Sequence, residues 1–200
     1  MRVLILGHTG MLGSTVCDYL HSLDSVSVVT IKHRWSTNSF KTAIKNFDGD
    51  YIVNCIGAIP QRTDKFEINY ELPIWLDKNV TCRVIHQDTD MKREEDDYAF
   101  SKAEASMFIS FDGKRTKMLK TSILGHDKSK VCLLDWFLNS KDNVFGYTDS
   151  YSNGNTTLEW AKQVYKMMNN WERYAKCTTI LIVYPSMSYS IYLKKFMKKK

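Results

Sequence analysis

The sequence predicts an α/β fold with a doubly wound parallel sheet, and three observations support this prediction. Short apolar segments of the kind that form buried strands alternate with segments of helical periodicity. A glycine-rich turn joins the first of these strands to the first helix, and no internal repeat interrupts the pattern. Such close alternation is typical of β-α-β units with right-handed crossovers. At 200 residues, 44% of them hydrophobic, we expect one globular domain over residues 1–200.

The first strand and turn predict a nucleotide-cofactor site. Arg2–Leu6 is a short apolar run that suits a strand buried on both faces, and Ser14–Leu20 continues in helical rhythm. Between them Gly7, Gly10 and Gly13 have G-x-x-G-x-x-G spacing. A diphosphate must approach the backbone closely, and the N–H groups that begin a helix attract an anion. The alternative is a glycine-rich turn that serves packing alone.

The second strand predicts which dinucleotide the chain prefers. Val26–Ile31 forms this strand, and Lys32, His33 and Arg34 follow at its carboxyl end. A carboxylate here would bind the ribose 2′-hydroxyl of NAD, whereas a basic side chain suits the 2′-phosphate of NADP. Because no carboxylate is present at this point, we expect NADP(H) to be preferred over NAD(H). The alternative is that Lys32 and Arg34 are ordinary surface charges.

The next elements complete the parallel core. Ser39–Phe47 has the spacing of an amphipathic helix, and Tyr51–Ile56 reads as a third buried strand. It ends in small residues, Gly57 and Ala58, which leave room for a cofactor at the edge where open α/β sheets bind ligands. We expect a helix over Phe66–Asn79, a fourth strand near Arg83–His86, and a polar loop over residues 88–97 at the same edge.

Tyr98 and Lys102 form the pattern that carries chemistry. Four residues apart on a helix, they project from one face. A neighbouring ammonium favours the phenolate and so lowers the pKa of a tyrosine, which can then act as a general acid toward a carbonyl oxygen. Thr89, at a nearby strand end, can supply a second hydroxyl. The alternative is a surface pair, since Y-x-x-x-K also occurs by chance.

Composition argues against several other function classes. The net charge is +6, but Lys194, Lys195, Lys198, Lys199 and Lys200 carry five of these charges, which leaves +1 for the rest. We therefore expect no nucleic-acid partner. The five cysteines and five histidines are scattered without metal-ligand spacing, so we expect no metal site and a reducing, cytoplasmic setting. The longest apolar run near the C-terminus, Ile180–Tyr184, is too short to span a membrane.

Several linked motifs resemble one family. In chain order they read GHTGMLGS, DYIVNCIGAIPQ, INYELP, RVIHQDTD, YAFSKAEAS, LKTSILGH, LLDWFL and GYTDSYSNGNTTLEWAK. They are similar to the extended short-chain dehydrogenase/reductases, most closely to the sugar-nucleotide-binding branch of dTDP-4-dehydrorhamnose reductase-like proteins. The resemblance implies an NAD(P)-binding Rossmann fold. It also implies an NAD(P)H-dependent reductase of a nucleotide-linked 4-keto-6-deoxy sugar.

The resemblance also implies roles for single residues. Tyr98 would protonate the C4 oxygen, Lys102 would lower the pKa of Tyr98 and hold the nicotinamide ribose, and Thr89 would bind the substrate carbonyl. Other cofactor contacts would come from the turn, from the end of the third strand, from the second-strand loop and from a later strand: Gly7, Gly10, Met11, Leu12, Gly13, Arg34, Ile56, Gly57, Ala58, Thr121, Ser122 and Ile123. The expected residues on the sugar-nucleotide side are Trp136, Asn153 and Gly154.

Three departures from the family pattern bear on activity. The loop Met91–Asp97 is shorter than the family's, and Asp88 replaces a serine, which would bring a carboxylate near an anionic substrate. The chain also stops tens of residues short of a typical member. We therefore expect a small, truncated substrate-binding appendage, to which residues 132–160 and 185–200 contribute.

These departures leave three functions open. The chain could be an active reductase, a nucleotide-sugar epimerase or dehydratase, or a non-catalytic subunit that binds the dinucleotide or the nucleotide sugar. Phe100, Met107 and Phe108 could serve a homodimer contact as easily as core packing.

Overall fold

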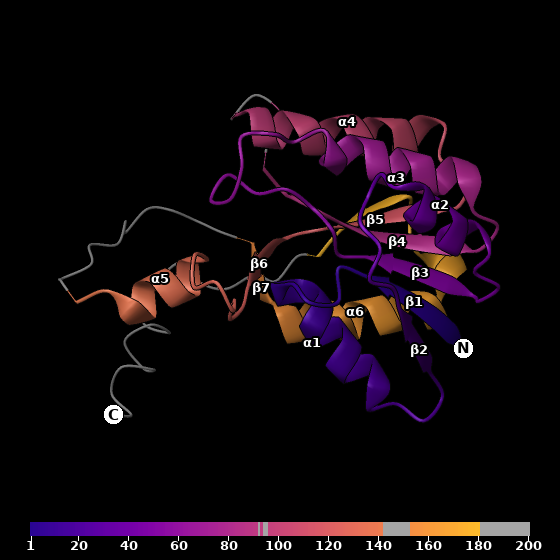
Figure 1. Cartoon of the computed structure of the whole chain (residues 1–200), viewed down its shortest axis with the longest axis horizontal. Coiled ribbons are helices and arrows are strands. Elements are labelled where there is room, and N and C mark those ends of the chain that lie inside the picture. The colour runs from indigo at the N-terminus through magenta and orange to yellow at the C-terminus, as the bar shows by residue number, and fades with distance from the viewer. Residues whose placement is uncertain (92, 94–95, 142–152, 181–200) are drawn as a thin grey trace.

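The structure is a computed structural model, and it describes residues 1–91, 93, 96–141 and 153–180. Its centre is a six-stranded parallel sheet with the strand order β2-β1-β3-β4-β5-β8 (Figure 1). These strands are β1 (Arg2–Leu6), β2 (Ser27–Thr30), β3 (Tyr51–Asn54), β4 (Arg83–Asp88), β5 (Thr116–Lys120) and β8 (Cys177–Thr179). The prediction of a doubly wound parallel sheet is confirmed.

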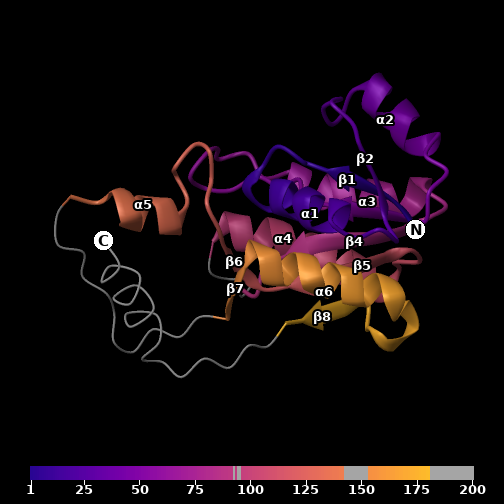
Figure 2. The same cartoon turned by 90° about the horizontal axis from the view of Figure 1, so that it is seen from below.

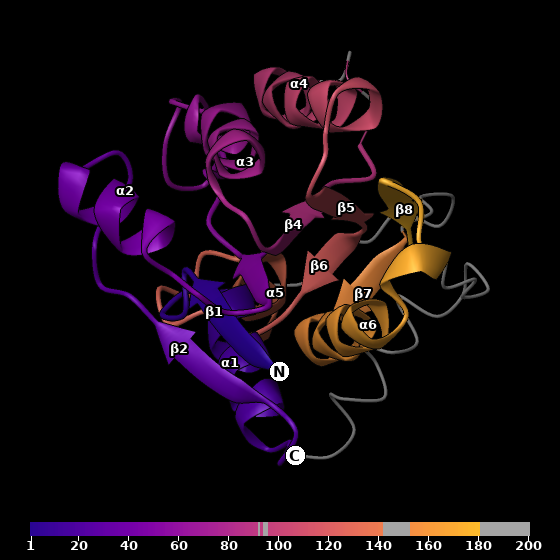
Figure 3. The same cartoon turned by 90° about the vertical axis from the view of Figure 1, so that its right-hand side faces the viewer.

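Helices cover both faces of this sheet. Viewed along the sheet, α1 and α6 lie on one side, and α2, α3 and α4 lie on the other (Figure 3). The helices are α1 (Met11–His21), α2 (Asn38–Lys45), α3 (Ile68–Asn79), α4 (Asp97–Phe111) and α6 (Thr157–Asn169), and a short 3₁₀ turn, η1 (Trp171–Arg173), follows α6. For the seven elements whose bounds the sequence predicts, from β1 to β4, the observed ends lie within three residues of the expected positions.

Successive apolar residues of the strands point to opposite faces of the sheet, and each face packs into its own hydrophobic core beneath the helices. Val3, Ile5 and Ile85 face α1 and α6, where Trp160 is fully buried. Leu4, Ile52 and Val84 face the other way and share a core with Phe40 of α2 and Leu72 of α3. This pattern explains the nearly continuous apolar runs of β1 and β3.

A second, smaller unit extends from the carboxyl end of β5. β6 (Ser122–Leu124) pairs in parallel with β7 (Gly154–Thr156), and α5 (Leu133–Asn139) lies apart from the layered body (Figure 2). This unit lies in the region where the sequence predicts a reduced substrate-binding part. Residues 142–152 and 185–200 of that prediction lie outside the described residues.

Candidate active site

The glycine turn after β1 has the shape that close approach of an anion requires. Gly7 has a φ of +76°, in the region that glycine alone adopts readily. A Cβ on Gly13 would lie 2.1 Å from the carbonyl oxygen of Gly7, so the helix and turn can pack this closely only without a side chain. Helix α1 begins at Met11, and its N-cap, Gly10, makes no side-chain hydrogen bond to the first turn. The N–H groups of that turn are therefore directed toward any ligand at the turn.

The end of β3 lies beside this turn, where the direction of strand order reverses between β1 and β3. Asn69 of α3 holds the loop that follows, because its Oδ1 accepts from the Ala58 N–H at 2.7 Å and its Nδ2 donates to the Ala58 carbonyl at 3.1 Å. The same Nδ2 donates to Ser101 Oγ of α4 at 3.0 Å. Asn69 thus ties the expected cofactor loop to the helix that carries Tyr98.

Tyr98 and Thr89 meet as the motifs predict. Asp96 caps α4 by accepting from the Ala99 N–H at 2.7 Å, which places Tyr98 in the first turn of the helix. The side chains of Tyr98 and Thr89 are hydrogen-bonded. The Phe66 ring packs edge-on against the Tyr98 ring with the centroids 5.9 Å apart. The two hydroxyl groups therefore lie at one point at the carboxyl edge of the sheet.

The pKa of Tyr98 differs from the expectation. Burial raises the pKa of Tyr98 to about 12, nearby carboxylates act in the same direction, and the Thr89 hydrogen bond opposes them. The carboxylates belong to Asp88, Asp96 and Asp90. The lowered pKa expected from the sequence is therefore not found in the protein without cofactor, because burial and three nearby carboxylates raise it. Tyr98 is a protonated phenol at neutral pH.

Lys102 is fully buried one turn further along α4. Its Nζ donates to the carbonyl oxygen of Gln87 at 3.1 Å and to Gln87 Oε1 at 3.0 Å. A Cβ on Gly57 would lie 3.4 Å from this Nζ, so the lysine borders the loop that follows β3. Burial lowers the pKa of Lys102 to about 8, while the Asp88 carboxylate acts in the opposite direction.

Asp88, which replaces a serine of the family pattern, is buried and has protein partners. Its carboxylate is 1% exposed and accepts hydrogen bonds from the Thr89 N–H and the Ser106 hydroxyl. Lys120, its neighbour on β5, lies 3.3 Å away as an ion-pair partner. Asp88 therefore points toward α4 and is partnered inside the protein, although its charge still raises the pKa of Tyr98. The expected charge conflict with an anionic substrate stays a prediction.

Ser122 joins this edge through Asp90. The Ser122 hydroxyl donates to Asp90 Oδ1 at 2.7 Å, so the start of β6 is tied to the loop that follows β4. Behind it, the Thr121 hydroxyl donates to the Asn153 carbonyl at 2.7 Å and accepts from Asn155 Nδ2 at 2.9 Å. These bonds hold β7 and the main chain of Asn153 beside the expected nicotinamide side of the site.

Two predicted residues lie away from this cluster. Arg34 is exposed in the loop after β2, where an adenosine ribose is expected. Trp136 is 53% exposed on α5, and the structure does not bring it to Tyr98.

The sequence did not predict two features of this edge: Gln87 as a partner of Lys102, and an ion pair between Arg62 and Asp127. Arg62 Nη2 donates to both carboxylate oxygens of Asp127, at 2.8 and 2.7 Å. The ion pair connects the loop after β3 with the loop after β6, and Asp127 itself is buried. A charged residue in each of two glycine-containing loops was the available signal, but their pairing depends on the fold.

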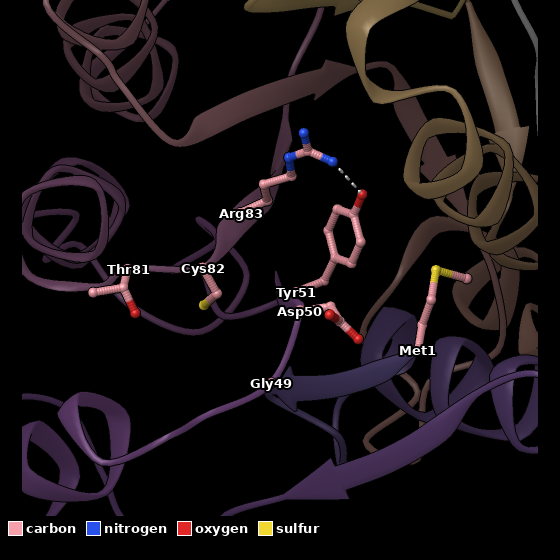
Figure 4. A pocket seen from close by; sticks show the side chains of 7 residues that line it. All are labelled: Met1, Gly49, Asp50, Tyr51, Thr81, Cys82 and Arg83. Carbon is pink, nitrogen blue, oxygen red and sulfur yellow. Dashed lines mark hydrogen bonds between the residues drawn. The ribbon is translucent and has the colours of Figure 1, made fainter.

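One pocket lies at the opposite, amino edge of the sheet. It has a volume of about 440 Å³ and is lined by residues that begin β3 and β4 and by the chain start (Figure 4). Within it, Arg83 donates to the Tyr51 hydroxyl at 3.1 Å. Because it opens at the amino ends of the strands, it is separate from Tyr98 and the glycine turn.

In the described part of the chain no helix has the length and apolar character to cross a membrane.

Comparison with known sequences identifies the part of the chain that carries the turn. Residues 3–71 match the sequence model of the NAD dependent epimerase/dehydratase family. The matched range includes the glycine turn, the end of β3 and Asn69. For the motifs in this range, the resemblance to an NAD-dependent family is confirmed. No curated protein matches the chain by sequence.

Solved structures extend the likeness to nearly the whole chain, at the level of fold. A dTDP-4-dehydrorhamnose reductase from Clostridium acetobutylicum is 17% identical with a TM-score of 0.68, over 99% of this chain and 81% of that one. The ADP-L-glycero-D-manno-heptose-6-epimerase of Helicobacter pylori is 12% identical with a TM-score of 0.76, over 97% and 81%.

A third structure contains a dinucleotide. It is a dTDP-4-dehydrorhamnose reductase from Bacillus anthracis in complex with NADP, which is 13% identical with a TM-score of 0.66, over 100% of this chain and 81% of that one. At these identities the comparisons show that this chain shares the fold of these reductases and of the epimerase.

Proposed function

We propose that the protein is an NAD(P)H-dependent reductase of a nucleotide-linked 4-keto-6-deoxy sugar, with NADP(H) preferred over NAD(H). The observation that carries this proposal is that Tyr98, in contact with Thr89, begins the helix whose next turn buries Lys102 beside Gly57, at the edge that also holds the glycine turn. Family likeness and the NADP-bound relative support it. Exposed Arg34, with no carboxylate beside it after β2, supports the preference for a 2′-phosphate.

The residues present fit a dinucleotide. Side chains at Gly7 or Gly13 would fill the turn, and Gly57 leaves open the space that borders Lys102 Nζ. Met11 and Leu12 begin the helix whose N–H groups would face the diphosphate, and Ile56 and Ala58 would line the cofactor. Lys102 and Ser122 would lie toward the nicotinamide half. The cofactor would supply the hydride when bound.

The chain's own groups would carry the proton. Because its pKa is about 12, Tyr98 keeps its proton at neutral pH and can donate it to a carbonyl oxygen. Thr89 is hydrogen-bonded to the same phenol and would help to hold that oxygen. Once Tyr98 has given up its proton, the positive charge of Lys102 and the Thr89 hydrogen bond would stabilise the phenolate.

The substrate side of the proposal rests on the smaller unit. Gly154 begins β7 opposite Ser122 and Asn153 directly precedes it, and Trp136 has an exposed ring on α5. We assign these residues to the nucleotide sugar, and we expect the protein to act in the cytoplasm. A homodimer remains a prediction, with Phe100 and Met107 both exposed on α4.

A Tyr98→Phe variant tests the proposed role of the phenol. The variant should bind NADPH with an unchanged dissociation constant, measured by the fluorescence of the cofactor. It should lose at least about 100-fold in kcat toward dTDP-4-dehydrorhamnose, because it has no proton to donate. Tyr165→Phe is the matched control, since that phenol lies on α6 and bonds Ser25. Unchanged turnover in Tyr98→Phe would rule out the mechanism.

The same assay separates the remaining functions. A reductase oxidises one NADPH for each sugar reduced, whereas an epimerase or dehydratase retains its cofactor and changes the sugar without net oxidation. The second outcome has a specific candidate activity, because the Helicobacter pylori epimerase has a similar fold. Binding of NADPH without conversion of any keto sugar would indicate a non-catalytic subunit.

A further inference from the structure

Gln87 lies at the carboxyl end of β4, directly beside the buried amine of Lys102. We propose that Gln87 is the positioning residue for Lys102, and that it sets where the lysine meets the cofactor. The second half of this inference rests on the proposed function, whereas the first half concerns the protein alone. Gln87 belongs to none of the motif positions to which the family resemblance gives a role.

The hydrogen bonds of Gln87 make it a fixed support. Lys102 Nζ donates to the main-chain oxygen of Gln87 at 3.1 Å and to its side-chain Oε1 at 3.0 Å. The side chain cannot turn freely, because its Nε2 donates to the Asp88 carbonyl at 2.9 Å. Two of the three N–H donors of Lys102 Nζ are thus directed at Gln87, and the Nε2 of the same side-chain amide is fixed by the Asp88 carbonyl.

A lysine in this position needs such a support. Its side chain has four methylene groups, and burying it in one conformation costs rotamer entropy. Lys102 is 1% exposed, so its ammonium has exchanged water for protein partners. With two donors bound to Gln87, the third remains for the space that the absent side chain of Gly57 leaves, 3.4 Å from Nζ.

The other ionisable groups around Lys102 are buried and have fixed charge states, so the Gln87 amide is the neighbour whose substitution should change the pKa of Lys102. On β4, Asp88 raises the pKa of Lys102, but its carboxylate is bonded to Ser106 and paired with Lys120. Burial holds the pKa of His86 well below its ordinary value, and Lys102 lowers it further, so that ring is neutral. After β3, burial raises the pKa of the Cys55 thiol far above neutral pH. Removing or charging Oε1 should therefore change the titration of Lys102 directly.

Two substitutions of similar size separate positioning from packing. Gln87→Met keeps the length of the side chain but removes the acceptor, so the pKa of Lys102 should fall by about one pH unit. Gln87→Glu adds a negative charge beside the ammonium, so the same pKa should rise by about one pH unit or more. A residue that only fills space would not move this titration in opposite directions.

The measurement is a pH titration by NMR of protein labelled with ¹³C at the lysine ε carbon. The Lys102 signal is assigned by its loss in Lys102→Met. Lys117 is an internal control, because it is also buried but donates to the Trp171 and Tyr174 carbonyls, and its titration should stay unchanged. Circular dichroism checks that each variant is folded, and Gln87→Glu, the closest in shape, keeps the test available if Gln87→Met unfolds.

Binding of NADPH then tests the second half. Gln87→Met should raise the NADPH dissociation constant about tenfold, because the lysine loses its fixed position. Opposite shifts in the two titrations, in a protein that binds no NADPH, would support the positioning role and contradict the proposed function. NADPH binding by the wild type, with a Lys102 titration that neither variant moves, would overturn the inference and leave the proposed function standing.

Discussion

Gly13 constrains the first turn more strictly than Gly10 does. A Cβ there would lie 2.1 Å from the Gly7 carbonyl oxygen, and this clash could be relieved only if the backbone moved. At Gly10 the nearest atom to an added Cβ is the same oxygen at 3.4 Å, which is ordinary contact. Two glycines three residues apart in one motif are thus under different steric constraints.

This difference gives a paired test of the turn. Gly13→Ala should lower the free energy of unfolding by about 1 to 3 kcal/mol, because the added methyl overpacks the contact between α1 and the turn. Gly10→Ala should lower it by less than about 1 kcal/mol, since the methyl fits. Urea unfolding measures both. Equal losses in the two variants would show that the close contact at Gly13 does not govern the turn.

Single residues also show what the sequence could and could not predict at the site. The meeting of Tyr98 with Thr89 was predictable, because each belongs to a motif with a known place relative to a strand end or helix start. The direction of Asp88 was not, because it depends on Ser106 and Lys120, which come from two other elements. The pKa of Tyr98 likewise depends on burial and on three carboxylates that only the fold assembles.

At the scale of elements, α3 positions the start of β5 through one carboxylate. Asp77 lies in the last turn of α3 and accepts from the N–H groups of Lys114, Arg115 and Thr116 at 2.8 to 3.1 Å. Burial alone would raise the pKa of Asp77, but these hydrogen bonds outweigh it and the pKa is lowered. The turn between α4 and β5 is therefore held by a charged acceptor of a neighbouring helix.

Asp77→Asn should loosen this connection. At pH 7 the free energy of unfolding should fall by about 1.5 to 3 kcal/mol, because the amide replaces one acceptor oxygen with a donor. A folded pKa below the unfolded value stabilises the protein above the unfolded pKa of about 4. That stabilisation is lost as the pH falls through the folded pKa.

The difference between wild type and Asp77→Asn should therefore shrink below about pH 4. Chemical unfolding at pH 7, 5 and 3 measures it. Asp112→Asn is the matched control, an exposed aspartate at the end of α4, and it should change the free energy of unfolding by less than about 0.5 kcal/mol. A constant difference between Asp77→Asn and wild type across this pH range would contradict the role of the charge.

Elements differed in how far the sequence predicted them. β1 and β3 are continuous apolar runs and the helices beside them have a helical apolar period, so they were predicted within a few residues. β6, β7 and β8 have three residues each, too few to show a period, and β8 pairs with β5 across more than fifty residues of chain. Their formation depends on partners that only the assembled sheet provides.

For the whole molecule, parallel strand order brings distant segments to one edge. The turn after β1, the loop after β3, Gln87 and Thr89 near the end of β4, and Ser122 all lie at carboxyl ends of strands. Open α/β sheets bind ligands at this edge, at the point where strand order reverses. The ion pair of Arg62 with Asp127 joins the loop after β3 to the loop after β6, so it connects the proposed site to the smaller unit.

A crystal structure of the protein with NADPH tests the central proposal most directly. We expect the diphosphate at the start of α1, against Gly10 and Gly13, and the nicotinamide ring in contact with Tyr98 and Lys102. Density for the cofactor at another place, or a nicotinamide ring separated from the Tyr98 hydroxyl by other side chains of the protein, would contradict the reductase and leave the fold unchanged.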